Sequence, residues 1–296
     1  MKPRSGVRWR FKITRWGMRL ANAASLQRPD EIFAANRAVG RIALSVATEG
    51  AHTRRRRVHE QGSLRVRFPN AAAGECEAVI VNTAGGIAGG DHFNLDFELG
   101  ERARLVVSGA AAEKVYRSLG ADAEIMLRLK VAAGAALRWL PQETILFDRA
   151  RLNRSIDVDL DGGASIVLAE AVVFGRSAMG ETVEHGKLVD RWRIRHDRRL
   201  IFAETLRLEG GIARKLAEPA VLKGGMALAT ILIVPGDDDL ATKLRAGSFT
   251  GEVGISAWNG IALARLCARD GATLRRDLVQ LLTALDRGPL PRLWLN

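Results

Sequence analysis

The chain has 296 residues, of which 47% are hydrophobic and 26% charged, and these proportions exclude a disordered protein. Its longest uncharged apolar stretches, such as residues 224–236, are shorter than the ~20 residues that a membrane helix needs, so we expect no membrane partner. The net charge of +12 suits either nucleic acid or an acidic protein as a partner. Aromatic residues, on which the bases of a single strand would stack, make up only 5%, so the acidic protein partner is favoured.

The first 29 residues contain eight Lys or Arg and no acid, and their apolar side chains follow no regular spacing. We expect a basic N-terminal arm or, if Met18 is the true start, a mis-assigned start. Residues 30–296 then form a single β domain. Basic residues interrupt the apolar runs of the first segment, so the order typical of a secretory signal is missing and we expect a cytoplasmic protein.

Alternation of apolar and polar side chains begins near Gly40 and recurs along the chain, and this period of two is typical of half-buried strands. The alternating segments are 42–46, 64–68, 93–99, 125–131 and 156–160. Two mostly apolar runs, 164–174 and 227–234, are interpreted as further strands. Glycine-rich turns separate many of these segments, as hairpins and strand connections require.

Helical periodicity is scarcer. It is found at 110–119, at 238–246 and most clearly at 272–286, where leucines recur at intervals of three and four. The sequence lacks a flexible linker, a repeat of 20 to 50 residues and a shift in composition. We therefore predict one large, mainly β domain with a few short helices, one of them near the C-terminus.

The segment Val79–Asp91 reads VIVNTAGGIAGGD, a strand followed by a glycine-rich loop. A phosphate-binding loop of this kind opens a helix whose first amides face the phosphate, but here the following residues alternate as a strand. We interpret Gly85, Gly86, Gly89 and Gly90 as a connection in which two backbones approach closely, with no nucleotide bound.

Metal ligands of the usual kinds are not clustered in the sequence. The five histidines, His52, His59, His92, His185 and His196, show no i, i+4 pair, and Cys76 and Cys267 lie far apart. This spacing predicts neither a tight structural metal site nor a disulfide framework.

Four acids lie in apolar or glycine-flanked segments: Glu143, Asp148, Glu170 and Glu181. Partly buried carboxylates must be paired, protonated or metal-bound. Ion pairs such as Glu143 with Arg149 or Glu181 with Arg176 are one interpretation, and metal ligation is the other.

The sequence contains no Gly-x-Ser-x-Gly or His-Glu-x-x-His signature, so no catalytic motif indicates an enzyme. Two competing interpretations remain open. A basic β-rich nucleic-acid-binding protein predicts retention on DNA with steep salt dependence. A small hydrolase built on carboxylates predicts turnover without partners.

Ordered motifs show a resemblance to a known family. They are HEQGSLRVRFP at 59–69, VNTAGGIAGGD at 81–91, AAEKVYRS at 111–118, LPQETILFD at 140–148, GRSAMGE at 175–181 and PRLW at 291–294. Together they resemble the urease accessory protein D family (UreD, also called UreH). The chain departs from the family pattern at Thr83-Ala84, where many members have two prolines, and at Gly62-Ser63-Leu64, where many have Gly-Pro-Leu.

The resemblance implies a large, helically wound β-sheet scaffold that is not an enzyme. Such a scaffold binds accessory protein F, which recruits the nickel-carrying GTPase G, and the assembly docks on the structural subunits of apo-urease for GTP-dependent nickel insertion. The resemblance also implies no tightly bound cofactor, only nickel in transit, and no nucleic acid. In such a fold we expect the glycine segment to be a tight turn capped by Asp91.

Family knowledge further suggests that nickel passes through the protein. Carboxylate and carbonyl oxygens suit such a path, because thiolates hold a late first-row ion too tightly to release it. We hypothesise that Glu143, Asp148, Glu170 or Glu181 lines this path.

Overall fold

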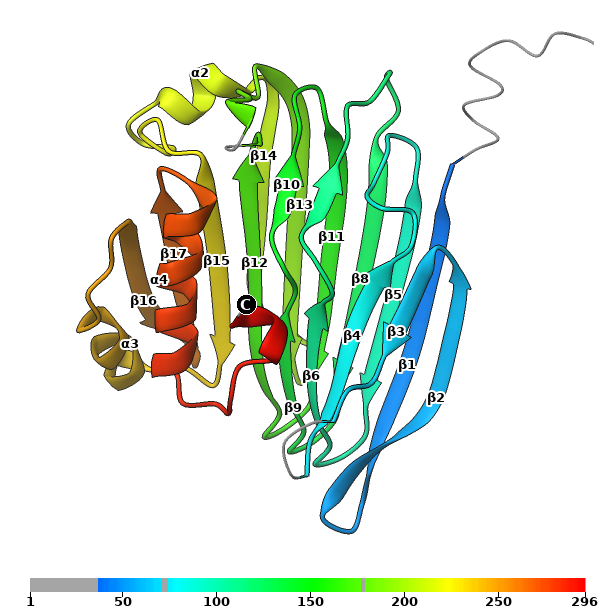
Figure 1. The fold of residues 1–296 in the computed structure, drawn as a ribbon. Coiled ribbons are helices and arrows are strands. Elements are labelled where there is room, and N and C mark those ends of the chain that lie inside the picture. Colours follow the sequence, from blue (N-terminus) through cyan, green and yellow to red (C-terminus); the bar gives the residue numbers. More distant parts are fainter. Residues whose placement is uncertain (1–36, 71–73, 177–178, 296) are drawn as a thin grey trace, which may run out of the picture. The chain divides into compact units, whose positions relative to one another are not determined.

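The computed structural model describes residues 37–70, 74–176 and 179–295 (Figure 1). Residues from Arg37 onward form one compact unit. The basic segment 1–29 lies outside the described residues, so its interpretation stays a prediction.

The first of two large sheets, sheet A, has seven strands in the order β14-β13-β11-β8-β5-β1-β2. In chain order they are β1 (Val39–Glu49), β2 (His52–Gly62), β5 (His92–Leu99), β8 (Ala123–Val131), β11 (Arg151–Leu160), β13 (His185–His196) and β14 (Arg199–Gly211). β2 and β14 are its edge strands, and each forms an antiparallel pair with its single neighbour.

The second sheet, sheet B, has ten strands, eight of them in the order β16-β17-β15-β12-β9-β6-β4-β3. They are β3 (Leu64–Arg67), β4 (Cys76–Asn82), β6 (Arg104–Gly109), β9 (Ala136–Leu140), β12 (Ser165–Phe174), β15 (Ala227–Val234), β16 (Glu252–Trp258) and β17 (Ile261–Ala268). The short strands β7 (Glu113–Val115) and β10 (Thr144–Leu146) extend it, because β10 pairs with both β7 and β12.

The central part of the chain is wound like a solenoid, with longer strands falling alternately in sheet B and sheet A. β4, β6, β9 and β12 run parallel in sheet B, and β5, β8, β11 and β13 run parallel in sheet A. Gly134 and Gly163, in two of the tight connections, have φ of +66° and +71°, which glycine adopts without strain. The predicted helically wound, mainly β fold is confirmed.

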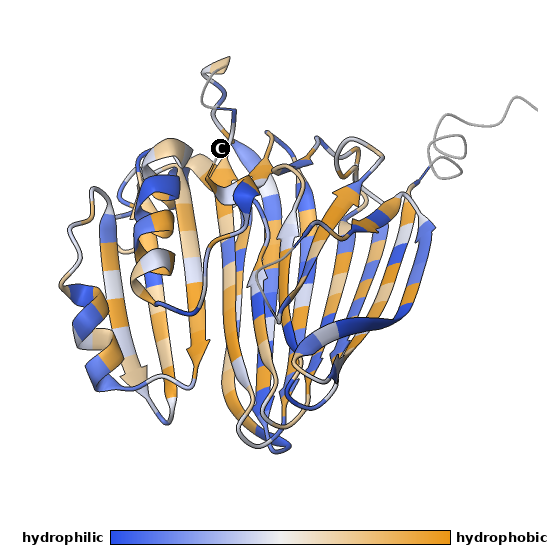
Figure 2. Cartoon of the chain, turned by 60° about the horizontal axis from the view of Figure 1, so that its bottom comes forward, coloured by the Kyte–Doolittle hydropathy of each residue, from blue (hydrophilic) through white to orange (hydrophobic). Residues whose placement is uncertain are grey.

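Two apolar layers explain the hydrophobic pattern. The inner faces of both sheets form the larger core, and the alternation of colour along the strands follows from it (Figure 2). The outer face of sheet B is also covered, by helices α3 (Asp238–Arg245) and α4 (Gly271–Ala284). Strand β12 is therefore buried on both faces, and its sequence does not alternate. Its inner row is Ile166, Leu168, Glu170, Val172 and Phe174.

Among the described residues, the helices are α2 (Ile212–Ala217), α3 (Asp238–Arg245), α4 (Gly271–Ala284) and a 3₁₀ turn, η2 (Arg292–Trp294). The predicted helices at 238–246 and 272–286 are confirmed. Asp270 caps α4 by accepting a 2.7 Å hydrogen bond from the Thr273 amide. Within the described part of the chain, no helix has the length and apolarity to cross a membrane.

The helix predicted at 110–119 is wrong, because β7 lies in this segment. Glu113, Lys114 and Val115 pair with β10, which follows them by some thirty residues in sequence. Long-range strand pairing here overrides the helix propensity of an Ala-rich stretch.

Candidate functional site

The glycine segment forms a compact turn before β5. Gly85, Gly86 and Gly90 have φ of +77°, +151° and +91°, conformations that favour glycine. Gly89 has no positive φ, but a Cβ there would contact the Ser118 hydroxyl and lie 2.5 Å from the Ala121 carbonyl oxygen. Close backbone approach therefore requires glycine at this position.

Asp91 is buried at the end of this turn, with 4% of its surface exposed. Its carboxylate accepts hydrogen bonds from the Ala88 amide at 2.7 Å and from the Ala38 amide at 2.8 Å. It joins the turn to the start of β1, and the residues after it form β5. No helix begins here, so the loop lacks the aligned amides of a phosphate site.

Glu143 is held by the C-terminal part of the chain. Its carboxylate lies 2.9 Å from Arg275 of α4, and not against Arg149 as one interpretation had it. Arg275 also donates to the Leu293 carbonyl and stacks 4.5 Å above the Trp294 ring. The LPQE motif and the closing PRLW motif are thereby locked together.

Asp148 and Glu181 lie close to each other in a separate place. Glu181 accepts from Arg176 at 2.8 Å, as the ion-pair interpretation predicted, and from the Asp148 amide at 3.4 Å. The hydrogen bond from Arg176 lowers the pKa of Glu181 below its usual value, against a smaller opposing effect of burial. Asp148 accepts from the His185 amide at 3.0 Å.

Glu170 belongs to a buried cluster that we call the triad: Arg154, Glu170 and Asp190. Arg154 donates from Nε to Asp190 Oδ1 at 3.1 Å and from Nη2 to Oδ2 at 2.5 Å, and its Nη1 contacts Glu170. Trp139 donates to the other Glu170 oxygen at 2.8 Å. The three charged side chains are 5%, 6% and 6% exposed, so they are removed from water.

Strand register brings the triad together. Arg154 of β11 and Asp190 of β13 are direct partners in sheet A, and both occupy inward positions that the neighbouring residues fill with apolar side chains. Glu170 occupies an inward position of β12 in the facing sheet. Arg154 therefore bridges the two sheets through the core.

Burial and the neighbouring charges shift the pKa values of Glu170 and Arg154 in opposite directions. Burial raises the pKa of Glu170 above its usual value, although Arg154 lowers it. Burial alone would lower the pKa of Arg154, but Asp190 and Glu170 raise it above its usual value. The guanidinium stays charged and balances one of the two carboxylate charges.

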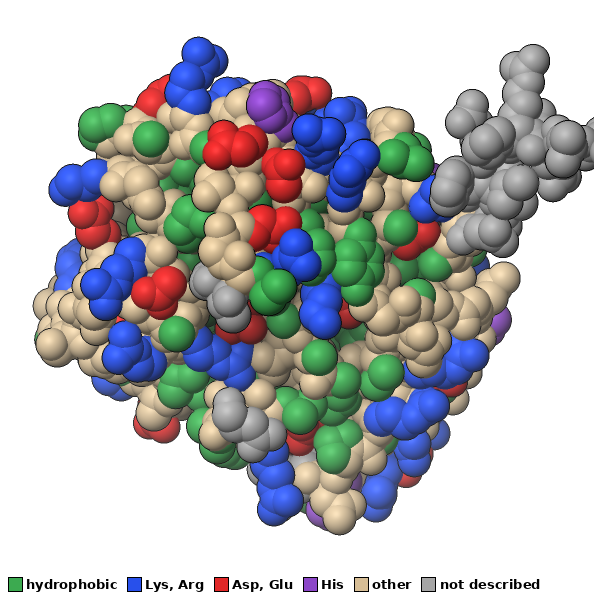
Figure 3. Space-filling model, turned by 45° about the horizontal axis from the view of Figure 1, so that its top comes forward, with side chains coloured by type: hydrophobic (Ala, Val, Ile, Leu, Met, Phe, Trp, Pro, Cys, Tyr) green, Lys and Arg blue, Asp and Glu red, His purple; other side chains and the backbone are tan. Residues whose placement is uncertain are grey.

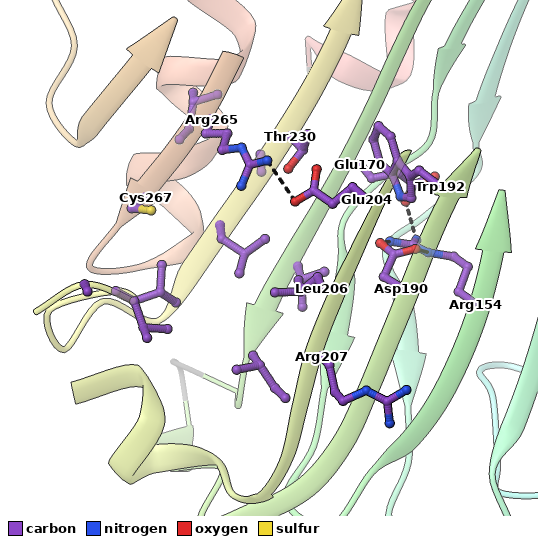
Figure 4. A pocket seen from close by; sticks show the side chains of 18 residues that line it. Arg154, Glu170, Asp190, Trp192, Glu204, Leu206, Arg207, Thr230, Arg265 and Cys267 are labelled. Carbon is purple, nitrogen blue, oxygen red and sulfur yellow. Dashed lines mark hydrogen bonds and ion pairs between the residues drawn. The ribbon is translucent and has the colours of Figure 1, made fainter. Parts of the chain in front are cut away.

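Two cavities meet at the triad. The outer cavity, of about 440 Å³, lies between β13–β14 of sheet A and β12, β15 and β17 of sheet B (Figure 4). Glu204 of β14 and Arg265 of β17 also line it, 2.8 Å apart and partly exposed to solvent. The inner cavity, of about 90 Å³, lies between the sheets on the side of Trp139. Arg154 and Glu170 line both cavities.

Glu113 lines the inner cavity with mostly apolar neighbours. Burial raises the pKa of Glu113, and a 3.1 Å hydrogen bond from the Asn82 amide only partly offsets this. Glu143, Asp148 and Glu181 line neither the outer nor the inner cavity. Of the four predicted acids, Glu170 alone reaches these two cavities.

Histidine and cysteine do not build a metal site in the described ranges, where no group of three or more His, Cys, Asp or Glu could hold an ion. His92 lies 3.4 Å from Glu124, and both side chains are exposed. Cys76 is buried, Cys267 lines the outer cavity, and burial raises the pKa of both thiols.

A basic strip follows the edge strand β2. Arg54, Arg55, Arg56 and Arg57 are all exposed, and Lys and Arg side chains gather toward the end of the sheets where β2 and β3 lie (Figure 3). Arg55 stacks 4.5 Å above the ring of Phe68 and Arg56 pairs with Glu49 at 2.8 Å.

Four residues of the triad and the cavities were not predicted from the sequence: Arg154, Asp190, Glu113 and Glu204. One signal was available for the first two. Each is a charged residue in the apolar phase of an alternating strand, as in Leu152-x-Arg154-x-Ile156. No local pattern marks Glu113 or Glu204, because the cavities are lined from both sheets.

The fold and the site define a solenoid-like β protein with a buried charged triad between two cavities. The sequence profile of the UreD urease accessory protein family matches residues 38–295. The chain is 56% identical over 268 residues to the urease accessory protein UreD of Rhodopseudomonas palustris strain CGA009, covering 90% of this chain and 96% of that one. It is 56% identical over 267 residues, with the same coverage, to the UreD of Bradyrhizobium diazoefficiens. The chain belongs to the UreD family of urease accessory proteins.

Proposed function

We propose that the chain acts in urease maturation as a non-catalytic scaffold required for GTP-dependent nickel insertion into apo-urease. The observation that carries this proposal is the near full-length identity to proteins named urease accessory protein UreD. We further propose a cytoplasmic location for this scaffold.

The partners in this proposal are accessory protein F, the GTPase G that F recruits, and the structural subunits of apo-urease. The GTP requirement belongs to G. The glycine turn supports this division, because it leads into β5 and presents no helix N-terminus to a phosphate.

Nickel passes through the chain, in this proposal, by way of the two cavities. Glu170 lies where they meet, and Glu113 and Glu204 supply further carboxylates along the same route. Oxygen ligands bind a late first-row ion weakly enough to release it. Glu143, Asp148 and Glu181 then serve the structure, through the hydrogen bonds and ion pairs that hold them.

The experiment that tests the function is genetic complementation. The cognate urease operon lacking this gene is expressed with nickel, with and without the gene restored on a plasmid, and urease activity is measured. We expect activity only with the gene. High activity without it, or none although the restored chain is folded and present, would contradict the accessory role.

A further inference from the structure

Arg154 lies where the outer and the inner cavity meet. Its guanidinium contacts Glu170 on one sheet and Asp190 on the other, and Arg154 and Glu170 line both spaces. An ion that moves between the two cavities past the triad therefore meets this guanidinium.

The two carboxylates converge on one cation. Asp190 offers both of its oxygens to Arg154, and Glu170 offers one while Trp139 holds the other. All three charged side chains are nine-tenths or more buried, so water cannot replace the guanidinium as their counter-charge. Buried carboxylates of this kind must be paired, protonated or metal-bound, so a metal cation can balance them in place of arginine.

We propose that Glu170 and Asp190 form a transient binding site for a divalent first-row metal cation, and that Arg154 is its displaceable counter-ion. The identity of the ion as nickel rests on the proposed function, whereas the exchange of guanidinium for metal does not. The outer cavity, with about 440 Å³ beside the triad, provides room for the displaced guanidinium.

The exchange explains how a buried pair of carboxylates can pass a metal on without trapping it. An arginine side chain keeps its charge at any physiological pH, so it leaves the site only by moving. The displaced guanidinium then competes with the bound metal for the two carboxylates and favours release of the metal. Arg154 thus weakens the site that it occupies.

The test is nickel binding to the purified full-length chain by isothermal titration with NiCl₂ at neutral pH. Arg154→Met removes the competitor and should bind nickel about tenfold more tightly than the wild type, a difference of about 1.4 kcal/mol. Adding Glu170→Gln or Asp190→Asn to Arg154→Met should abolish this gain. A gain that survives both additions lies at another site and overturns the proposal.

The matched control is Arg195→Met. Arg195 also faces two carboxylates, Asp157 at 3.5 Å and Asp159 at 3.7 Å, but its side chain is 39% exposed. Its loss should leave nickel affinity unchanged, because exposed aspartates are solvated by water. An equal gain in this control would show a general charge effect and overturn the proposal.

Arg154→Met leaves two buried acids unpaired, so its folding is checked by thermal unfolding with and without NiCl₂. Nickel should raise its Tm more than that of the wild type. Arg154→Lys retains a cation with a single-point contact and should bind nickel with an affinity between the two. If neither variant binds nickel more tightly than the wild type, Arg154 is a structural bridge only. Since titration needs no urease, a tenfold gain supports the exchange even where complementation by the wild type fails.

Discussion

At the scale of single residues, Glu170 and Glu143 are both carboxylates paired with arginine, yet their surroundings differ. Glu170 is 6% exposed and lies between two cavities. Glu143 ties the LPQE motif to α4, away from both. Because only the first lies on the proposed nickel route, the two acids should respond differently to the same substitution.

Glu170→Gln preserves the size of the side chain and should slow urease activation about fivefold, the equivalent of about 1 kcal/mol for one lost charged contact. Glu143→Gln should leave the activation rate unchanged but lower the free energy of unfolding by about 1 kcal/mol. Activation is measured in cells at equal levels of folded chain, and stability by urea unfolding. Equal effects of both changes on activation would remove Glu170 from the route.

The lowered pKa of Glu181 predicts that the stability of the fold depends on pH. Its pKa is lowered in the folded chain by the hydrogen bond from Arg176, so the pair stabilises the fold fully above the ordinary pKa of about 4.3 and less as pH falls through the lowered value. Glu181→Gln should therefore lose stability at neutral pH, and its difference from the wild type should shrink in acid. Thermal unfolding across pH measures this, with Glu252→Gln, whose side chain is 74% exposed, as the control.

At the scale of elements, the glycine turn before β5 depends on space as much as on φ. Gly89→Ala places a Cβ against Ser118 and 2.5 Å from the Ala121 carbonyl, so it should lower the free energy of unfolding by about 1–3 kcal/mol. Gly254→Ala is the control, because nothing lies within 4 Å of a Cβ there. Chemical denaturation of both variants decides, and a loss confined to Gly254→Ala would refute the steric argument.

The arginines of β2 protect an edge strand. Charged side chains on an exposed edge prevent pairing with another sheet. Replacing Arg54, Arg56 and Arg57 with Thr should increase aggregation, measured by light scattering at 37 °C as a faster rise. Removing the same charge away from the edge strands, with Thr at the exposed Arg191, Arg214 and Arg269, is the control. Equal aggregation of both variants would mean that net charge alone matters.

At the scale of elements, a strand could be predicted from the alternation of its sequence where one of its faces meets the core and the other meets solvent. β5 and β8 alternate cleanly because their outer faces are polar, whereas β12 has an apolar run because both faces are covered. Strand β2 was not predicted, because its arginines are exposed on both faces and its sequence does not alternate between apolar and polar residues. The wrong helix at 110–119 shows that pairing with a distant strand can outweigh local propensity.

At the scale of the whole molecule, contacts between residues far apart in the sequence decide which side chains become partners, and local sequence patterns do not predict these contacts. Arg275 reaches Glu143 across 132 residues, and the triad draws on three strands from two sheets. The acids were recognisable as candidates from their apolar neighbours. Their partners were not, because partner choice follows from the winding of the chain.

Trp294 predicts how strongly the C-terminus holds the molecule together. It is 3% exposed, donates a 2.9 Å hydrogen bond to the Leu140 carbonyl and lies beneath Arg275. Trp294→Ala should lower the free energy of unfolding by about 3–5 kcal/mol, as for other buried tryptophans. Leu295→Ala, at a residue 66% exposed, should change it little. Urea unfolding compares the two, and similar losses would argue against a locking role.

The covering of sheet B by the end of the chain has a consequence for synthesis. β12 leaves the ribosome about a hundred residues before α4, an interval on the order of 5–20 s of translation. For that interval the nascent chain carries an apolar sheet face that nothing of its own can cover. A stop codon before α4 makes the exposure permanent, so we expect such a truncated chain to be a substrate for holdase chaperones and proteases before it is a partner for urease.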